Sequence, residues 1–358
     1  MYDVIIIGGG ASGLTAAVVA LSRGKNALVL EASERVGKKI LLAGNGRCNV
    51  SNVDLSVSHY NDEKVVSFLR RSEKVFSFFE TIGLKTREID GRLYPYSESG
   101  KTVLNLLRSA LPPQNVVANY PVESVKKEGD RFVVGEYCAR SVVFATGSKA
   151  TVGRESYDLL TAFGHTVRCP LPALCPLTCV KNDVKGLSGL RAKVELSLLD
   201  DENKVLSRRG EILFKDEGVS GIVTMELSRF LFGEKTLSID FLPDMTLSEA
   251  EAFLSKHSPE GLVQRVIADK VAAQSAARGV SLAQGLKGYR IRGAKRCGYK
   301  QAQVMQGGVP LEEFDERLES KKTPGVFACG EVLDVDGDCG GYNLHWAFLS
   351  GVIVGESV

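Results

Sequence analysis

Residues 1–31 carry the feature that most constrains the fold of this chain. Asp3-Val-Ile-Ile-Ile7 is an apolar run typical of a buried parallel strand, and it leads directly into Gly8-Gly9-Gly10-Ala-Ser-Gly13. The alanine-rich stretch 14–23 predicts a helix, and Ala27-Leu-Val-Leu30 predicts a second strand. A strand, a glycine turn, a helix and a strand in this order predict a parallel α/β sheet covered by helices.

The spacing of the glycines predicts a dinucleotide site. Gly8 permits the tight turn, Gly10 lets the backbone approach a pyrophosphate, and Gly13 lets the helix pack closely on the strand. The helix N-terminus offers free N–H groups and the positive end of its dipole to the phosphates. Glu31, at the end of the second strand, can accept hydrogen bonds from an adenosine ribose, and its charge disfavours a 2′-phosphate. These residues leave FAD and NAD open.

Three further segments favour FAD. The loop 37–52 places two glycines around an asparagine, next to basic and amide side chains. A strand is predicted at 141–144, and it runs into Ala145-Thr146-Gly147. Another strand is predicted within 325–331, and it ends in glycine and glutamate. A strand–Gly–Glu element so far along the chain suits the long FAD molecule, whose ribitol and isoalloxazine extend away from the first turn. The expected cofactor contacts are Gly8, Gly10, Ala11, Ser12, Gly13, Glu31, Lys39, Gly46, Arg47, Asn49, Ala145, Thr146, Gly147, Gly330, Glu331, Asp334, Gly341 and Asn343.

Composition and charge argue against several classes of protein. The chain has 358 residues, enough for about two domains. Its 45 basic and 43 acidic side chains leave a net charge of +2, so neither nucleic acid nor an anionic membrane is an expected partner. No apolar run reaches the roughly 18 residues of a membrane span, and the N-terminus lacks the basic region of a signal peptide. We expect a cytoplasmic protein with a small-molecule substrate; its oligomeric state stays open.

The eight cysteines do not indicate a disulfide framework or a dithiol redox centre, because no Cys-x-x-Cys pair exists. His165, Cys169, Cys175 and Cys179 have the residue types of a zinc site. Their uneven spacing and the prolines between them favour packed thiols instead, so no metal is expected.

These segments resemble the BaiN/YhiN-type flavoproteins, a family of NAD(P)/FAD-dependent oxidoreductases with a glutathione-reductase-like FAD fold. The resemblance covers nearly the whole chain and is carried by the N-terminal fingerprint and by residues 37–49, 210–214, 218–221, 302–309, 330–336 and 340–344. It implies a Rossmann-like FAD-binding domain formed by both ends of the chain, with an inserted β-barrel plus helical domain.

We place the FAD-binding domain at 1–174 and 293–358, and the insert at 175–292. Short alternating segments at 192–199, 212–214 and 237–242 predict strands of the insert, and 247–256 and 261–278 predict helices. Thr246-Leu-Ser-Glu249 predicts a capping box at the start of the first helix.

The candidates for acid–base catalysis are Arg47, Tyr342 and His345, chosen by position. Cys48 is a weaker candidate, because a packed thiol is the simpler interpretation. His345 stands where glutamine is common in the family, and we favour a structural role in the first turn of the last helix, bonded to the backbone. That helix is expected to begin at Asn343, with its N-terminal N–H groups towards the flavin. Lys215 and Asp216 depart from the family pattern and put a catalytic role for their loop in doubt.

Three functions remain open. The first is an FAD-dependent reductase that uses NAD(P)H and a small organic substrate, with steroid or bile-acid enone reduction as one possible substrate class. No second glycine fingerprint follows residue 150, so NAD(P)H would bind only transiently. The second is an oxidase that passes electrons from an amine or alcohol to O2. The third is a flavin-binding protein that modifies RNA or serves assembly, which the missing basic stripe disfavours.

Overall fold

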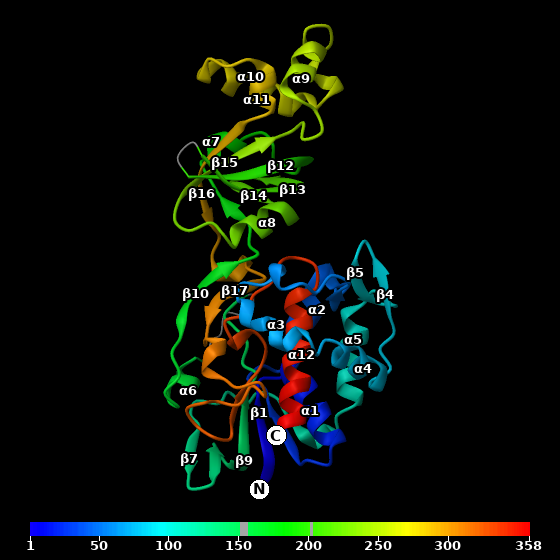
Figure 1. Ribbon diagram of the computed structural model, residues 1–358, viewed down its shortest axis with the longest axis vertical. Helices are drawn as coiled ribbons and strands as arrows, with labels where there is room; N and C mark the ends of the chain where they lie inside the picture. The colour runs from blue at the N-terminus through cyan, green and yellow to red at the C-terminus, as the bar shows by residue number, and fades with distance from the viewer. Residues whose placement is uncertain (151–156, 201–202) are drawn as a thin grey trace. The chain divides into compact units, whose positions relative to one another are not determined.

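The computed structural model describes residues 1–150, 157–200 and 203–358 and divides the chain into two compact units (Figure 1). The first unit comprises Met1–Leu171 and Val304–Val358, and the second comprises Pro172–Gln303. The expected architecture is confirmed: both ends of the chain form an α/β domain, and the segment between them forms a barrel with helices.

A sheet forms the centre of the first unit. Its parallel strands lie in the order β6-β2-β1-β9, β18 pairs with β9, and β8 and β7 continue from β9 in antiparallel fashion. Val4 of β1 lies opposite Ala27 and Ser141, and Val326 of β18 lies opposite Val142, so strands from both ends of the chain share one sheet. The bounds are β1 (Tyr2–Ile7), β2 (Ala27–Leu30), β6 (Val116–Val117), β7 (Lys126–Glu128), β8 (Arg131–Val134), β9 (Tyr137–Phe144) and β18 (Val326–Ala328).

Two helices, α1 (Ala11–Ser22) and α12 (Tyr342–Ser357), pack against each other in this unit (Figure 1). Glycine makes the close approach possible, because a Cβ on Gly351 would lie 2.5 Å from the Ser12 carbonyl oxygen. The remaining elements of the unit are α2 (Lys38–Leu42), α3 (Val66–Leu69), α4 (Glu73–Thr81), α5 (Gly100–Ser109), α6 (Asp158–Thr161) and the sheet of β3 (Ser51–Asn52), β5 (Arg92–Pro95) and β4 (Thr86–Ile89). The strand β17 (Val304–Gly308) pairs with β10 (Arg168–Ala173), whose last two residues belong to the second unit.

The second unit is a closed barrel in the order β11-β14-β13-β12-β15-β16, with its own apolar core. Its elements are β11 (Leu177–Thr178), α7 (Lys181–Val184), β12 (Arg191–Asp200), β13 (Asn203–Lys215), β14 (Gly218–Ser220), α8 (Ile222–Ser228), β15 (Lys235–Asp240), α9 (Leu247–Leu254), α10 (Arg265–Arg278), α11 (Leu282–Leu286) and β16 (Tyr289–Arg296).

The ends of this unit differ from the expected insert at 175–292. Residue 292 lies in the middle of β16, and the pairing of Arg296 with Leu177 closes the barrel between β16 and β11. Because the barrel needs all of β16 to close, the second unit extends past the expected end at residue 292, to Gln303. The helix expected from residue 261 begins at Arg265, since Pro259–Gly261 forms a separate 3-10 turn.

The capping box at the start of α9 is confirmed. The Thr246 hydroxyl accepts from the Glu249 backbone N–H at 3.2 Å, and the Glu249 carboxylate accepts from the Thr246 backbone N–H at 2.7 Å. The box satisfies two N–H groups that the helix itself leaves without partners.

Candidate cofactor site

The glycine turn between β1 and α1 has the geometry that its spacing predicts. Gly8 adopts a left-handed φ of 109°, and a Cβ there would lie 2.3 Å from the Ala145 carbonyl oxygen. A Cβ on Gly13 would lie 2.0 Å from the Gly8 carbonyl oxygen. Gly10 differs, because no described heavy atom outside its chain neighbours comes within 4 Å of the place its Cβ would take. The turn therefore leaves open space at the position where backbone is expected to approach a pyrophosphate.

The N-terminus of α1 is available to an anion. Gly10 is its N-cap, no side chain in the described ranges caps this end, and the first turn contains no acidic residue. The exposed N–H groups and the helix dipole favour a bound negative charge there.

Glu31 ties the end of β2 to the glycine turn. Its carboxylate accepts from the Gly9 backbone N–H and from the Ser33 backbone N–H, each at 2.7 Å. An ionised carboxylate has about four acceptor sites, so the side chain can also accept from a ribose hydroxyl. Glu31 thus has a role in holding the turn as well as the expected role in holding the cofactor.

Glu331 lies just beyond β18 and joins segments from distant parts of the chain. Its carboxylate accepts from Lys39 Nζ at 2.6 Å, from Ser148 Oγ at 2.6 Å and from the Met305 backbone N–H at 2.9 Å. The side chain is 18% exposed, so this ion pair is only partly shielded from water. Sequence reasoning named Lys39 and Glu331 but missed Ser148, although its hydroxyl directly follows the Ala145-Thr146-Gly147 motif.

Thr146 Oγ1 and Asn49 Oδ1 are among the buried polar atoms that have no hydrogen-bond partner within the described residues. Thr146 follows Ala145, whose carbonyl oxygen would lie 2.3 Å from a Cβ on Gly8. Asn49 lies beside Gly341, because a Cβ on Gly341 would lie 2.7 Å from Asn49 Oδ1. A buried polar atom without a partner costs about 1–3 kcal/mol, so a ligand that donates or accepts at these positions would remove that cost. The open space at Gly10, the free end of α1 and these two atoms fit FAD. We call Gly8–Gly13, Lys39, Thr146, Ser148 and Glu331 the glycine-turn site.

The loop 44–48 has unusual backbone geometry, with left-handed φ values at Gly44, Asn45, Gly46 and Cys48. Arg47 forms an ion pair with Glu98, and its guanidinium lies 4.4 Å from the centre of the Tyr94 ring. These contacts tie Arg47 to the residues around β5. Burial raises the pKa of the Cys48 thiol to about 12, which disfavours the thiolate that a nucleophile requires.

The start of α12 carries three of the expected residues, Gly341, Tyr342 and Asn343. The helix begins at Tyr342, one residue before the expected start, with Gly341 as a left-handed N-cap. A Cβ on Gly341 would lie 2.4 Å from the Ser51 carbonyl oxygen. The Asn343 amide is used within the chain, since it accepts from the Gly337 backbone N–H and donates to the Gly337 carbonyl, both at 2.9 Å.

His59 is a residue of this region that sequence reasoning missed. Its ring stacks on Tyr342 at 4.4 Å, and its two nitrogens lie 3.1 Å from Asp54 and from Asp338. Partial burial lowers the pKa of His59, but the hydrogen bonds to Asp338 and Asp54 raise it, and the net shift is upward. A lone histidine in a polar loop gives no sequence signal for such a pairing.

His345 has a structural role. It is fully buried, with Nδ1 2.9 Å from Ser51 Oγ and Nε2 3.0 Å from Ser72 Oγ. Burial lowers its pKa to about 3, so the ring is neutral at physiological pH. The ring partners are two serine hydroxyls rather than the backbone that the sequence interpretation favoured.

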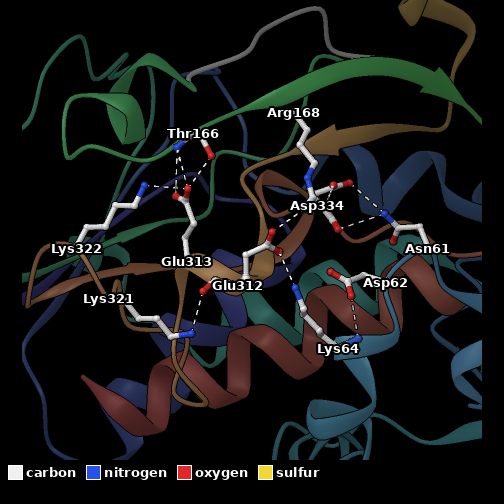
Figure 2. Close-up of polar contacts among 10 residues, drawn as sticks. All are labelled: Asn61, Asp62, Lys64, Thr166, Arg168, Glu312, Glu313, Lys321, Lys322 and Asp334. Carbon is white, nitrogen blue, oxygen red and sulfur yellow. Dashed lines mark hydrogen bonds and ion pairs between the residues drawn. The ribbon is translucent and has the colours of Figure 1, made fainter.

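Asp334 is bonded to Asn61 and Arg168 (Figure 2), whereas Glu331 is bonded to Lys39 and Ser148. One oxygen accepts from Asn61 Nδ2 at 3.1 Å and from the Gly307 backbone N–H at 3.0 Å, and the other accepts from Arg168 at 2.9 Å. Its side chain is 6% exposed. Asp334 and Glu331 each have three protein donors, but Asp334 is the more buried of the two, with 6% of its side chain exposed against 18%. We therefore propose that Asp334 holds the frame in place of the predicted contact with FAD. We call Asn61, Arg168, Gly307 and Asp334 the Asp334 network.

Figure 2 also shows a second charged group nearby, centred on Glu313. The Glu313 carboxylate accepts from Thr166 Oγ1 at 2.6 Å and from Lys322 Nζ at 2.9 Å. His165, one member of the four residues considered for zinc, has Nδ1 2.6 Å from Glu313 and Nε2 2.8 Å from Ser320 Oγ. The described residues contain no group of three or more His, Cys, Asp or Glu side chains arranged for a metal ion.

Residues 2–357 match the family described as HI0933-like protein Rossmann domain. The chain belongs to this family. The expected resemblance to BaiN/YhiN-type proteins is thereby confirmed. Among curated relatives of this HI0933-like protein, the 3-dehydro-bile acid delta(4,6)-reductase of Clostridium scindens is 32% identical, covering 100% of this chain and 99% of the relative. The ribosomal RNA dihydrouridine synthase of Escherichia coli is 28% identical, covering 98% of this chain and 96% of the relative.

Solved structures agree with the fold of the HI0933-like protein. A 3-ketosteroid delta1-dehydrogenase from Sterolibacterium denitrificans aligns with a TM-score of 0.54 at 13% identity, covering 99% of both chains. A 3-ketosteroid-delta4-(5alpha)-dehydrogenase from Rhodococcus jostii aligns with a TM-score of 0.51 at 15% identity, covering 99% of this chain and 96% of that chain. At such identities the likeness concerns the fold alone. Among the described helices, none combines the length and the apolar character that crossing a membrane requires.

Proposed function

We propose that this protein is an FAD-dependent oxidoreductase that uses NAD(P)H to reduce a carbon–carbon double bond conjugated to a carbonyl group in a small organic substrate. The observation that carries the proposal is the similarity to a bile-acid reductase over the full length of both chains. The glycine-turn site supports the cofactor, because its open space and unpartnered buried atoms suit FAD.

The names of the relatives support this bond type. The two named activities, a delta(4,6)-reductase of a 3-dehydro-bile acid and a dihydrouridine synthase, both imply saturation of a carbon–carbon double bond conjugated to a carbonyl group. Saturation adds one hydride and one proton across the double bond, and NAD(P)H supplies both electrons and becomes NAD(P)+. Bound FAD would relay the hydride between the two substrates, which then occupy the protein in turn.

The residues of the chain have distinct parts in this scheme. The N-terminus of α1 and Gly10 would bind the pyrophosphate, Glu31 would accept from the ribose, and Glu331 with Lys39 would hold the ribitol side. Near the start of α12, the phenol of Tyr342 is the group that could carry a proton to the substrate carbon, and the His59 ring stacks on it. His345 is neutral and bonded to two serines, so it does not serve as the acid.

Anaerobic mixing tests the proposal directly. FAD-loaded protein should lose its yellow colour with NADH or NADPH, and a Δ4-3-ketosteroid should restore the colour in a single turnover without air. Reduction by amines or alcohols, with reoxidation by O2 and not by the enone, would instead establish the oxidase alternative.

RNA base reduction is the second candidate function. It is favoured by two relatives that are ribosomal RNA dihydrouridine synthases, at 28% and 27% identity over almost the whole chain. The net charge of +2 argues for the small-molecule substrate, since RNA binding normally relies on a basic surface. Mass spectrometry of ribosomal RNA incubated with the protein and NADPH distinguishes the two candidate functions. Each uridine that is reduced to dihydrouridine gains two hydrogen atoms, or about 2 Da.

A further inference from the structure

The small sheet of β3, β5 and β4 gathers positive charge on one of its two faces. Arg87 of β4 lies directly opposite Tyr94 of β5, and Ile89 lies opposite Arg92. Residues directly opposite each other project on the same side of a sheet, and side chains alternate along each strand, so Arg87, Arg92 and Tyr94 share one face. Glu88, the acidic residue of β4, projects on the other face. We call the face that carries Arg87, Arg92 and Tyr94 the Arg87 face.

Glu98 joins two arginines at this face. One oxygen of its carboxylate pairs with Arg87, and the other pairs with Arg47, which comes from the loop 44–48. The Arg47 guanidinium also lies 4.4 Å from the centre of the Tyr94 ring, which places it over the same face. Because two guanidiniums share one carboxylate, the three side chains together keep a net positive charge.

Both guanidiniums are held by protein contacts and remain accessible. Arg87 lies 5.2 Å from the centre of the Tyr96 ring, and its side chain is 40% exposed, while that of Arg47 is 44% exposed. A guanidinium has five N–H donors, so the pairing with Glu98 leaves donors for a second anion. The ring contacts and ion pairs restrict these side chains before any ligand arrives, so binding an anion costs less side-chain entropy.

The chemistry of the Arg87 face favours a single phosphate monoester. A guanidinium binds a phosphate through two parallel N–H···O bonds, and a phosphate monoester carries about two negative charges near neutral pH. An RNA strand needs a basic surface that extends along many phosphates, whereas the net charge of this chain is only +2. Among nucleotides that serve oxidoreductases, NADPH differs from NADH by one such monoester, and arginine is the residue that accommodates it.

We propose that Arg87, supported by Arg92, binds the 2′-phosphate of NADPH and gives the protein a preference for NADPH over NADH. NADH has a hydroxyl at that position and offers the guanidinium no anion. The loop 44–48, where Gly46 and Arg47 are predicted contacts of FAD, borders this face, so a dinucleotide held here begins next to the predicted cofactor contacts. The use of NAD(P)H as the reductant rests on the proposed function, whereas the binding of the phosphate does not.

Calorimetric titration of the oxidised, FAD-loaded protein tests the phosphate site without any reaction. The probes are adenosine 2′,5′-bisphosphate and adenosine 5′-monophosphate, which differ only in the 2′-phosphate. We expect the bisphosphate to bind at least about tenfold more tightly at low salt, and this preference to shrink at high salt. Arg87→Gln should bring the two affinities within about twofold of each other, and Arg92→Gln should weaken the bisphosphate by about threefold.

Arg131→Gln is the matched control for these variants. Arg131 lies on β8, a strand of the same unit, where its side chain is 50% exposed and pairs with Glu128 at 3.3 Å. It therefore removes an exposed, paired guanidinium from a strand outside the Arg87 face, and it should change neither affinity. FAD content and the circular dichroism spectrum show that each variant is folded and loaded.

Anaerobic reduction of the flavin gives a second measurement. The Kd of NADPH should be at least about tenfold below that of NADH in the wild type. Arg87→Gln should raise the Kd of NADPH to near that of NADH while the limiting rate of flavin reduction stays near normal. This split is expected because Arg87 contacts the phosphate and not the reacting nicotinamide, so its loss removes binding that is equal in the ground state and the transition state.

Three outcomes overturn the proposal: the two probes bind the wild type equally, Arg87→Gln keeps the preference for the bisphosphate, or a short single-stranded RNA displaces the bisphosphate and binds more tightly than NADPH. If the bisphosphate binds through Arg87 but neither NADPH nor NADH reduces the flavin, the proposed function fails while the phosphate site stands. If both nucleotides reduce the flavin with equal Kd and Arg87→Gln changes neither value, the phosphate site fails and the proposed function stands.

Discussion

The glycine-turn site and the Asp334 network lie in the same unit and use the same kinds of side chain, but they differ in how fully protein atoms satisfy the polar groups. In the Asp334 network, a buried carboxylate has donors from a side-chain amide, a backbone N–H and a guanidinium. In the glycine-turn site, Thr146 Oγ1 has no partner within the described residues, and Gly10 faces open space. A region whose buried polar groups are hydrogen-bonded by protein atoms stabilises the fold. A region with open space and buried polar groups that lack protein partners is available to a ligand.

The largest effect that tests this difference is expected at Gly10. Gly10→Ala should lower FAD affinity by more than about a hundredfold, because the added Cβ takes space needed by the pyrophosphate, while the free energy of unfolding of the apo-protein changes by less than about 1 kcal/mol. Gly13→Ala is the control, since its Cβ would lie 2.0 Å from a carbonyl oxygen and should destabilise the apo-protein. Fluorescence titration with FAD and urea unfolding measure the two quantities. Wild-type FAD content in Gly10→Ala would show that the phosphate lies elsewhere.

The second-largest effect on FAD affinity is expected from changing Glu331. Glu331→Gln keeps the shape and removes the charge, so it releases Lys39 and should weaken FAD binding by about ten- to a hundredfold. The rate of flavin reduction at saturating FAD should stay near normal, because we assign the residue to holding the cofactor. Glu34→Gln, at an exposed glutamate of the same unit, is the control. Loss of flavin reduction with unchanged FAD affinity would make Glu331 catalytic and contradict this assignment.

A smaller effect is expected from changing Asp334, and it concerns the free energy of unfolding instead of FAD affinity. Asp334→Asn should lower the free energy of unfolding by about 1.5 kcal/mol, since an amide cannot accept from all three donors. FAD affinity of the folded variant should remain within about threefold of wild type. Glu63→Gln, at an exposed residue, is the matched control for urea unfolding. If Asp334→Asn loses FAD instead of stability, the two regions are not as distinct as the geometry indicates.

The smallest effect is expected at His59, which pairs with two carboxylates while remaining partly exposed. Its pKa is raised in the folded protein, so the pairing stabilises the fold fully below the ordinary histidine value near 6.5 and loses this contribution as the pH rises through the higher folded value. Wild type should therefore exceed His59→Gln in stability by less than about 1 kcal/mol at pH 5.5, and the difference should shrink by pH 8.5. Urea unfolding at both values measures this, with His257→Gln as the control. A difference that grows with pH would contradict the assignment.

Much of the backbone geometry of the candidate cofactor site was predictable from local sequence. Gly8, Gly10 and Gly13 are placed by the chain turning between β1 and α1, and Glu31 by the end of β2, which lies beside β1. Glu331 was predictable because it follows a buried strand that joins the same sheet. The partners of Glu331 were harder to foresee, since Ser148 and the Met305 N–H reach it from separate strand ends.

The sequence by itself determined the α/β fold, the dinucleotide turn and the capping box of α9, because each depends on preferences within a few residues and on the period of the apolar pattern. The tertiary structure alone decided what surrounds each polar side chain. Asp334 resembles Glu331 in the sequence, and each has three donors from distant segments. The fuller burial of Asp334, with 6% of its side chain exposed against 18% for Glu331, is why we assign it to the frame. His345 could have been an acid, yet burial between two serines keeps it neutral. The pKa and the hydrogen-bond partners of a group depend on burial and on residues far along the chain, and only the folded chain sets these.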